Sequence, residues 1–240
     1  MPHPRSQELW ISAPGELQRC LQEAGRSGRR VIVDFDETLW LRNSTEEYLD
    51  AVRPRSLAFL VLAAIDVAKP WRLSGNPIKE RIYRDWLRVL ILTCLFPWCL
   101  PNWRRRAGSL GRQWLNEDLV EMARRAECSQ LYVATLGFAP IVKPLLAQIY
   151  PNAILIAASL SAGYKIRKIG KKAAFDRQFG HGFVADAIVI TDSEDDKDLL
   201  SSCHRGFLIK WPKALYRPAF SNCCVPLRRT LRALFDRSAV

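Results

Sequence analysis

Short apolar runs alternate with helix-length segments along this chain, and this alternation restricts its fold more than any other feature of the sequence. Buried strands are predicted where Val, Ile, Leu and Ala dominate, at residues 31–35, 130–134, 153–159, 187–191 and 206–210. Helical spacing of apolar residues predicts helices at residues 7–24, 138–149, 171–179 and 195–202. Strands that alternate with helices favour a parallel sheet with helices on both faces. The sequence therefore predicts an α/β fold with a doubly wound, Rossmann-like parallel sheet.

One long segment interrupts this alternation between the first and second predicted strands. It contains helical patterns separated by prolines, at residues 44–52, 55–68, 77–96 and 114–126. It shows no strand pattern and is too long for an ordinary loop. We expect an all-helical insertion over residues 43–126 and an α/β core formed by residues 1–42 and 127–240. A last, basic helix is predicted at residues 226–236.

Polar side chains cluster where the predicted strands end and on the helix that precedes the fourth strand. They are Asp34, Asp36 and Thr38 at the end of the first strand, Thr135 after the second, Lys171 and Lys172 on the helix, and Asp192 and Asp196 after the fourth. The carboxyl ends of parallel strands share one edge of the sheet, so we expect these side chains to converge. Clustered carboxylates repel one another and need a cation, and hard oxygen ligands favour Mg²⁺.

Such a set of side chains suits the transfer of a phosphoryl group. A metal ion and a lysine neutralise the phosphoryl oxygens, and one carboxylate attacks phosphorus to give an aspartyl-phosphate. A second carboxylate two residues on protonates the leaving group and then deprotonates water. Taken singly, each feature has a plainer explanation: a cap or turn for the acids, and a solvated helix face for the lysines. Their joint order after successive strands favours an active site.

Four segments resemble the four motifs of the haloacid dehalogenase-like superfamily. They are VIVDFDETL (residues 31–39), LYVAT (131–135), GKKAAFDRQFG (170–180) and AIVITDSEDD (187–196). The resemblance covers residues 30–40 and 130–210, and the first motif is the most specific. Within the superfamily, the chain resembles most the domains that accompany membrane prenyltransferases of the UbiA type.

The resemblance implies a role for each matching side chain. Asp34 would be the nucleophile, Asp36 the general acid and base, and Thr135 and Lys171 the residues that hold the phosphate. An acid at the position of Asp36 favours phosphatase or phosphomutase chemistry over dehalogenation. In this family, an insertion between the first two motifs forms a helical cap over the active site, which here would be residues 43–126.

The resemblance also implies a Mg²⁺ site and shows three departures from the family pattern. The implied ligands are Asp34, Asp36 through its backbone carbonyl, Asp192 and Asp196, although Asp196 could instead orient Lys171 or a metal-bound water. Glu37 replaces the usual glycine, and we expect its side chain to point outward. Thr191 stands where glycine often precedes the fourth-motif aspartate. Lys172 and, more weakly, Lys168 compete with Lys171 for the role of the lysine.

The predicted insertion is basic and rich in tryptophan, in a chain whose formal net charge is +12. Its tryptophans are Trp71, Trp86, Trp98, Trp103 and Trp114. Tryptophan beside Arg and Lys on apolar helices is typical of a segment at a membrane interface or of a lipid phosphate site. A small helical core with a solvated basic rim explains the composition equally well. Binding to nucleic acid is disfavoured, because no recognised fold for that purpose is present.

Other features bound the class of protein. The seven cysteines include no CxxC pair, which argues against a disulfide framework or structural zinc and favours a reducing compartment. The start of the chain lacks the apolar region of a signal peptide. The apolar runs at residues 57–67 and 87–100 are shorter than the roughly 20 residues that span a bilayer. We expect a cytoplasmic protein whose membrane contact, if any, is peripheral.

The sequence thus predicts a magnesium-dependent phosphatase that acts through an aspartyl-phosphate. Its expected substrate is a phosphorylated small molecule or a lipid-linked, amphiphilic phosphate. Two alternatives stay open, since the same motifs serve them. One is phosphotransfer to an acceptor other than water, and the other is a non-catalytic regulatory partner of a membrane prenyltransferase.

Overall fold

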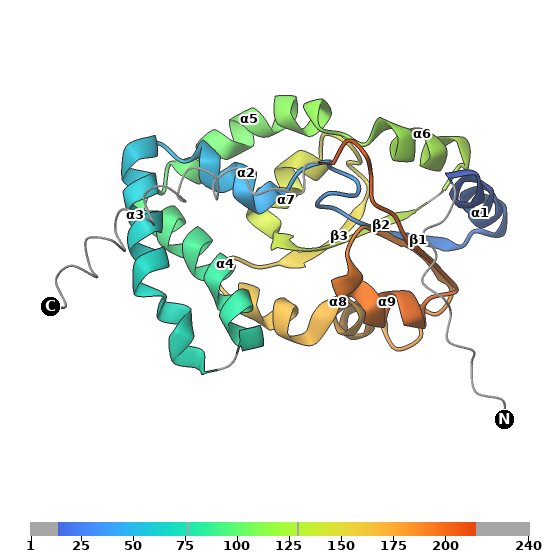
Figure 1. The fold of residues 1–240 in the computed structure, drawn as a ribbon. Coiled ribbons are helices and arrows are strands. Elements are labelled where there is room, and N and C mark those ends of the chain that lie inside the picture. The colour runs from blue at the N-terminus through green and yellow to red at the C-terminus, as the bar shows by residue number, and fades with distance from the viewer. Residues whose placement is uncertain (1–13, 76, 129, 215–240) are drawn as a thin grey trace, which may run out of the picture.

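A computed structural model describes residues 14–75, 77–128 and 130–214 of the chain (Figure 1). Five parallel strands form one sheet in the order β3-β2-β1-β4-β5. The strands are β1 (Arg30–Asp34), β2 (Leu131–Phe138), β3 (Ile154–Ala158), β4 (Ala187–Thr191) and β5 (Arg205–Leu208). The predicted α/β fold with a parallel sheet is confirmed, while the helix predicted at residues 226–236 lies outside the described residues.

Strand β1 occupies the middle of the sheet. It pairs with β2 on one side, where Asp34 lies opposite Ala134, and with β4 on the other, where Val33 lies opposite Ile190. The strand order reverses at this point, because β2 and β3 extend to one side of β1 and β4 and β5 to the other. In sheets of this kind, ligands bind outside the carboxyl ends of the strands at the point of reversal. The ends of β1 and β4 are therefore the expected location of the site.

Helices cover both faces of the sheet, because successive strand residues point to opposite sides. Val31 and Val33 belong to a core cluster on one face, and Ile32 belongs to a second cluster on the other. The first face is covered by α1 (Pro14–Ser27), α6 (Glu117–Arg125) and α7 (Ala139–Leu146), and the second by α8 (Gly163–Phe179) and α9 (Lys197–Ser202). The two-sided burial is the physical origin of the apolar runs from which the strands were predicted.

The segment between β1 and β2 is helical, as predicted. Beside α6 it forms α2 (Ser44–Ala51), α3 (Arg55–Ala68), the 3₁₀ turn η1 (Pro70–Ser74), α4 (Pro77–Leu95) and α5 (Cys99–Gln113). Helix α4 packs on α8, where the indole N–H of Trp86 donates to the Leu160 carbonyl at 2.8 Å. Helix α5 packs on α7, where the Trp103 indole donates to the Ile141 carbonyl at 2.9 Å. Among the described residues, no helix is both long and apolar enough to cross a membrane.

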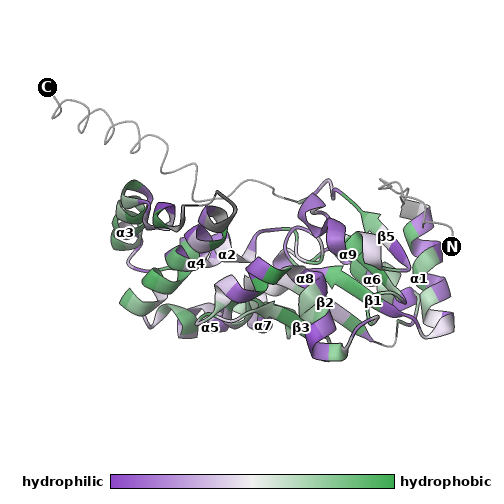
Figure 2. Ribbon diagram, turned by 90° about the horizontal axis from the view of Figure 1, so that it is seen from below, coloured by the Kyte–Doolittle hydropathy of each residue, from purple (hydrophilic) through white to green (hydrophobic). Residues whose placement is uncertain are grey.

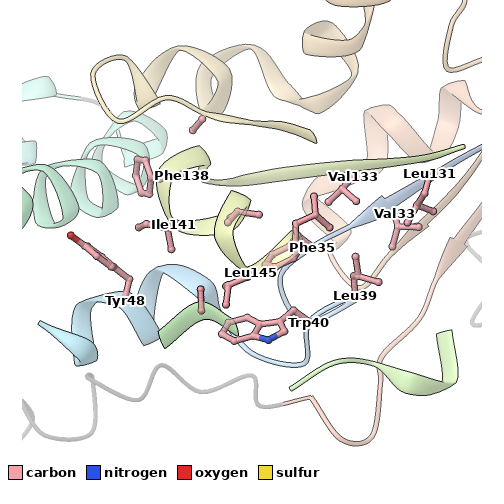
Figure 3. Close-up of a cluster of buried hydrophobic side chains, with 14 of the residues drawn as sticks. Val33, Phe35, Leu39, Trp40, Tyr48, Leu131, Val133, Phe138, Ile141 and Leu145 are labelled. Carbon is pink, nitrogen blue, oxygen red and sulfur yellow. The ribbon is translucent and has the colours of Figure 1, made fainter. Parts of the chain in front are cut away.

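The insertion and the sheet share one hydrophobic core. Figure 3 shows Phe35 and Trp40, from the loop after β1, in the same cluster as Leu145 of α7 and Tyr48 of α2. The rings of Phe35 and Trp40 stack with centroids 6.0 Å apart. Aromatic packing against the core thus fixes the loop that follows β1. The polar side chains of the same loop, Asp36 and Thr38, lie near the strand ends.

Helix α5 is the element that the sequence pattern missed. A helix was predicted at residues 114–126, but the chain forms α5 before that range and α6 within it. The buried positions of α5 follow a regular four-residue repeat, Cys99, Trp103, Ala107 and Gly111. Pro101 and two glycines are unfavourable in helices, so the repeat was not recognised as a helix. A Cβ at position 111 would lie 3.2 Å from the Leu145 carbonyl oxygen, so glycine here allows α5 to approach α7 closely.

Candidate active site

The nucleophile predicted from the sequence is the last residue of β1. Asp34 is 7% exposed, and its two carboxylate oxygens have different partners. Oδ1 accepts a hydrogen bond from the backbone N–H of Phe35 at 2.7 Å. Oδ2 lies 2.8 Å from Nζ of Lys171, which is also buried. Asp34 and Lys171, 137 positions apart in the sequence, therefore meet at the central strand end, as predicted.

Lys171 and Asp34 belong to a closed ring of polar contacts. Nζ of Lys171 also lies 2.7 Å from Oδ2 of Asp196. The hydroxyl of Thr191 lies 2.6 Å from that same Asp196 oxygen and 3.2 Å from Oδ2 of Asp34. The single hydroxyl proton of Thr191 serves these two carboxylates, while the ammonium group of Lys171 bridges both. We call these four residues the Asp34 ring.

Thr191 is a site residue that sequence reasoning did not find. Its position was noted only as a departure from the glycine of the family pattern. The structure places its side chain fully out of solvent, and its oxygen also accepts from the backbone N–H of Ser193 at 3.1 Å. The available signal was a hydroxyl residue at the end of a strand, immediately before an expected metal ligand.

A kink in α8 selects Lys171 among the neighbouring lysines. Gly170 has φ 84° and interrupts the helix, so that Lys171 begins its second part. Lys172 points elsewhere and pairs with Asp176 on the same helix at 2.6 Å. Lys168 is exposed to solvent. A Cβ at position 170 would lie 2.9 Å from Oδ2 of Asp198. A residue other than glycine would also have to adopt a positive φ, so glycine fits both requirements.

The second carboxyl group of the first motif is held from two elements. Oδ1 of Asp36 accepts from the backbone N–H of Ser44 at 2.6 Å, and Oδ2 accepts from the hydroxyl of Thr135 at 3.0 Å. Thr135 in turn accepts from the N–H of Gly137 at 2.8 Å. A Cβ on Gly137 would lie 3.1 Å from both Oδ2 of Asp36 and Oγ1 of Thr135, so a larger residue would disturb this pair. Asp36 and Thr135 meet as predicted.

Asp192 is positioned by the loop that follows β1. Its Oδ1 accepts from the hydroxyl of Thr38 at 3.0 Å. The side-chain amide of Asn116 donates to the Thr38 carbonyl at 2.8 Å, and the Asn116 side-chain oxygen caps α6 through the N–H of Leu119. Asn116 is buried and was not singled out in the sequence. It links the end of the helical insertion to the loop that carries the first motif.

Glu37 occupies a left-handed backbone conformation, with φ 62°. Glycine adopts this region at little cost, which explains physically why glycine is usual at this position. The expectation that the Glu37 side chain points outward holds only in part. It is half-buried, and burial together with the negative charges of Asp192 and Asp36 raises its pKa to about 7.

Burial raises the pKa of three carboxyl groups of the site. Burial raises the pKa of Asp34 to about 8, and the charges of Asp196 and Asp192 add to this effect against the opposing charge of Lys171. Burial likewise raises the pKa of Asp36 and of Asp192. For Lys171, burial alone would disfavour the charged form, but Asp34 and Asp196 outweigh it and raise the pKa above its usual value. Lys171 is therefore charged throughout the physiological range.

The donor atoms at the strand ends fit Mg²⁺ in part. Among the described residues, no three His, Cys, Asp or Glu side chains are placed to hold one metal ion together. The carboxyl group of Asp196 is engaged by Lys171 and Thr191, and that of Asp36 by Ser44 and Thr135. Asp34, whose oxygens also have partners at the site, and Asp192 repel one another, and a cation bound between them would relieve this repulsion. Mg²⁺ is usually bound through one or two carboxylates together with water and substrate phosphate, so two such donors suffice.

Comparisons with known proteins leave the chemistry to be argued from this geometry. No protein-family model and no curated protein sequence matches the chain. Among solved structures, the chain is similar to a phosphoserine phosphohydrolase-like protein from Francisella tularensis subsp. tularensis SCHU S4. The two share 15% sequence identity with a TM-score of 0.44, over 82% of this chain and 99% of the other. At this level of similarity the likeness carries no information about substrate or reaction.

Proposed function

We propose that this protein is a magnesium-dependent phosphatase that forms an aspartyl-phosphate on Asp34. The observation that carries the proposal is the Asp34 ring at the carboxyl end of the central strand, with Asp36 anchored two residues away. A buried carboxylate held by a charged lysine beside a second, proton-holding carboxyl group is suited to attack on phosphorus. The resemblance of the four motifs to the haloacid dehalogenase-like superfamily supports the same reaction.

The first step transfers the phosphoryl group to Asp34. A carboxylate oxygen of Asp34 forms a bond to phosphorus as the bond from phosphorus to the ester oxygen breaks. Asp36 gives its proton to the departing oxygen, for which its raised pKa is suited. Lys171 and Thr135 bind phosphoryl oxygens and stabilise their charge. Mg²⁺ bound by Asp34, Asp192 and the Asp36 backbone carbonyl would supply further positive charge at the phosphoryl group.

The second step restores Asp34. Asp36, now ionised, takes a proton from water as the water oxygen bonds to phosphorus, and the bond from phosphorus to Asp34 breaks. The products are inorganic phosphate and an alcohol, and both carboxyl groups return to their starting states. The backbone N–H of Ser44 holds the Asp36 carboxyl group through both steps, because it fixes one of its oxygens while Thr135 turns to the phosphoryl group. Asp196 acts through Lys171, whose ammonium group it orients.

The same proposal assigns residues 43–126 as a cap over the site, with residues 1–42 and 127–240 as the core. Two contacts at the ends of the insertion support this division. Ser44, at the start of α2, donates to Asp36, and Asn116, before α6, donates to the Thr38 carbonyl. A cap joined to the site at both ends would exclude water from the phosphoryl group during transfer.

The substrate that we propose is amphiphilic, with a polar group next to the phosphate. Glu46 Oε2 and Arg88 Nε are buried atoms without a hydrogen-bond partner among the described residues. Arg88 contacts Glu46 at 3.2 Å, so these atoms lie between α2 and α4, and Ser44 adjoins Asp36. Buried polar atoms without partners are costly, which supports a role in holding a polar group of the substrate. The apolar helices of the insertion support an apolar group beyond it.

The proposed function is tested by measuring phosphate released from a panel of small and lipid phosphates with Mg²⁺. We expect release that is abolished by a chelator and lost in Asp34→Asn protein. Asp118→Asn on the exposed surface of α6 makes the same chemical change away from the site and should leave release unchanged. Unchanged activity in Asp34→Asn protein would contradict the proposal. Labelled enzyme in the absence of release would point instead to transfer to an acceptor other than water.

A further inference from the structure

The outer side of the helical insertion exposes large apolar side chains. Among the described residues, the large apolar side chains that are exposed to solvent all lie in the insertion. They are Leu57, Leu60, Val67, Leu73, Leu95 and Trp98. Leu73 is 93% exposed and Leu60 is 57% exposed. Single exposed apolar residues are ordinary on a protein surface, whereas a concentration in one region indicates a binding surface.

Helix α3 supplies most of this surface because it is apolar on both sides. Its buried side is formed by Ala58, Leu62 and Ile65. Its outer side follows the spacing of one helix face, with Leu57, Leu60, Ala64 and Val67 all exposed. From residue 56 to residue 68 the helix has one charged residue, Asp66, and that residue is buried. The outer side of α3 therefore presents no charge to solvent over about three turns.

The apolar surface continues past both ends of α3. Leu73 lies in η1, directly after the helix. Trp98 lies beside the start of the helix, where its indole N–H donates to the Arg53 carbonyl at 2.8 Å. Figure 2 shows α3 at the opposite end of the molecule from α1. We call the outer side of α3, together with Leu73 and Trp98, the α3 face.

Most tryptophans of the insertion do not contribute to this face. Trp71 and Trp103 are buried, and Trp86 and Trp114 are half-buried. The expectation of a tryptophan-rich interfacial segment is therefore wrong for Trp71 and Trp103. Trp98, which is 48% exposed, is the most exposed tryptophan of the insertion.

Positive charges border the α3 face. Arg53 and Arg55 precede the helix, and Lys69 and Arg72 follow it. Arg53, Arg55 and Arg72 are exposed, whereas Asp66, the acid between residues 53 and 73, is buried. Asp50 offsets only Arg55, at 2.9 Å. An apolar face bordered by cations is the arrangement with which peripheral proteins bind anionic lipid surfaces.

We propose that the α3 face docks on an anionic bilayer surface, with its apolar side chains among the lipid headgroups and its arginines on lipid phosphates. Charge separates this partner from two others. A second copy would bring two positive borders together across a symmetric interface, which is unfavourable. The segment at residues 215–240 carries five arginines against one acid, so it too would be repelled. The proposal is independent of the phosphatase activity.

Vesicle sedimentation with the full chain tests the proposal. We expect binding to phosphatidylcholine vesicles that contain phosphatidylserine, weaker binding to pure phosphatidylcholine, and loss of binding as salt is raised. The double variant Leu60→Glu/Val67→Glu should bind the mixed vesicles about tenfold more weakly or less. The control variant Asn152→Glu/Gln178→Glu makes the same charge change at exposed positions outside the insertion and should bind as the parent does.

Three results would overturn the proposal. The first is equal vesicle binding by the Leu60→Glu/Val67→Glu variant and the parent. The second is binding to neutral vesicles as strong as to anionic ones. The third is a protein that ignores vesicles but is dimeric by light scattering, and that becomes monomeric in the same variant. Circular dichroism melting of each variant ensures that a loss of binding is measured on folded protein.

Discussion

In most of a folded protein, apolar side chains are buried and ionisable side chains are exposed. The strand ends and the α3 face depart from this rule in different ways. At the strand ends the protein buries ionisable groups, with Asp34, Lys171 and Asp196 nearly inaccessible to solvent. On the α3 face it exposes apolar groups, with Leu60 and Val67 about half exposed. Each arrangement costs free energy in the isolated protein, by desolvation of charge in one case and by hydration of apolar surface in the other. Each cost is relieved by a ligand of matching chemistry.

The two regions differ in how firmly their side chains are held. The carboxylates of the Asp34 ring are fixed by hydrogen bonds and ion pairs from three elements. Leu57, Leu60 and Val67, on the outer side of α3, are apolar side chains and form neither kind of contact. Chemistry at phosphorus requires fixed geometry, whereas contact with a fluid lipid surface does not. Polar side chains in a fixed arrangement therefore indicate a ligand that reacts, whereas exposed apolar side chains indicate a surface that binds without fixed geometry.

The largest effect is expected from removing the lysine of the Asp34 ring. Lys171→Met leaves Asp34 and Asp196 without their shared cation, so phosphate release should fall by roughly 10³-fold or more. The free energy of unfolding at pH 8 should fall by about 3–5 kcal/mol, because buried charge loses its partner. Lys172→Met, one residue on, removes only the partly exposed pair with Asp176. Equal loss of release in the two variants would contradict the assignment of Lys171.

The two sides of α3 should respond differently to the same substitution. Leu62 is fully buried, so Leu62→Ala should lower the free energy of unfolding by about 2–5 kcal/mol. Leu60→Ala, on the outer side, should change it by no more than about 0.5 kcal/mol. Urea denaturation measures both values. A large loss in Leu60→Ala protein would mean that Leu60 packs against something in solution, and the α3 face would no longer be free.

A smaller effect is expected from the hydroxyl of Thr191. Thr191→Val keeps the shape and removes the hydrogen bond, so kcat should fall about 10- to 100-fold with KM nearly unchanged. Thr191→Ser restores the hydroxyl and should recover most of kcat. A simple packing role would predict the opposite ranking, with Thr191→Ser the more damaging change because it loses a methyl group.

A last expected effect, on stability and not on activity, is a dependence of metal-free stability on pH. The pKa of Asp34 is raised by burial from 3.8 to about 8, so the folded protein binds a proton that the unfolded chain releases. This contribution is full below about pH 4 and is lost as the pH rises to about 8, so the melting temperature should fall over that range. Mg²⁺ should offset the fall, most strongly at high pH. Asp34→Asn should flatten the profile, and an unchanged slope in that variant would assign the effect to another group.

The fold and the principal site residues could be predicted because their signals are local. A strand buried on both faces reads as an apolar run, and an acid directly after it, such as Asp34 or Asp192, must lie at the sheet edge. Such inferences need only the order of residues within one segment. They therefore held for β1 and β4 without knowledge of what packs around them.

The residues that were missed depend on contacts between distant segments. Asn116 holds the loop after β1 by donating to the carbonyl of Thr38, 78 positions earlier. The residues around Asn116 in the sequence give no indication of this contact. Thr191 matters because its hydroxyl donates to the carboxylates of Asp196 and of Asp34, which is 157 positions earlier in the chain. Gly111 has a low intrinsic helix propensity, but its lack of a side chain allows the close approach of α5 to α7. In each case the role of the residue depends on a contact with a distant segment, which the local sequence does not contain.

The central place of β1 in the sheet has a kinetic consequence. Because β1 is paired with β2 on one side and with β4 on the other, its amide groups can exchange with solvent only when the middle of the sheet opens. Asp34 ends this strand, so it sits in the part of the molecule that opens least often. Amides of α3, which lies at the edge of the structure with one side uncovered, belong to the part that opens most easily. Motions that admit and release substrate must therefore come from the helices, while the reacting carboxylate stays still.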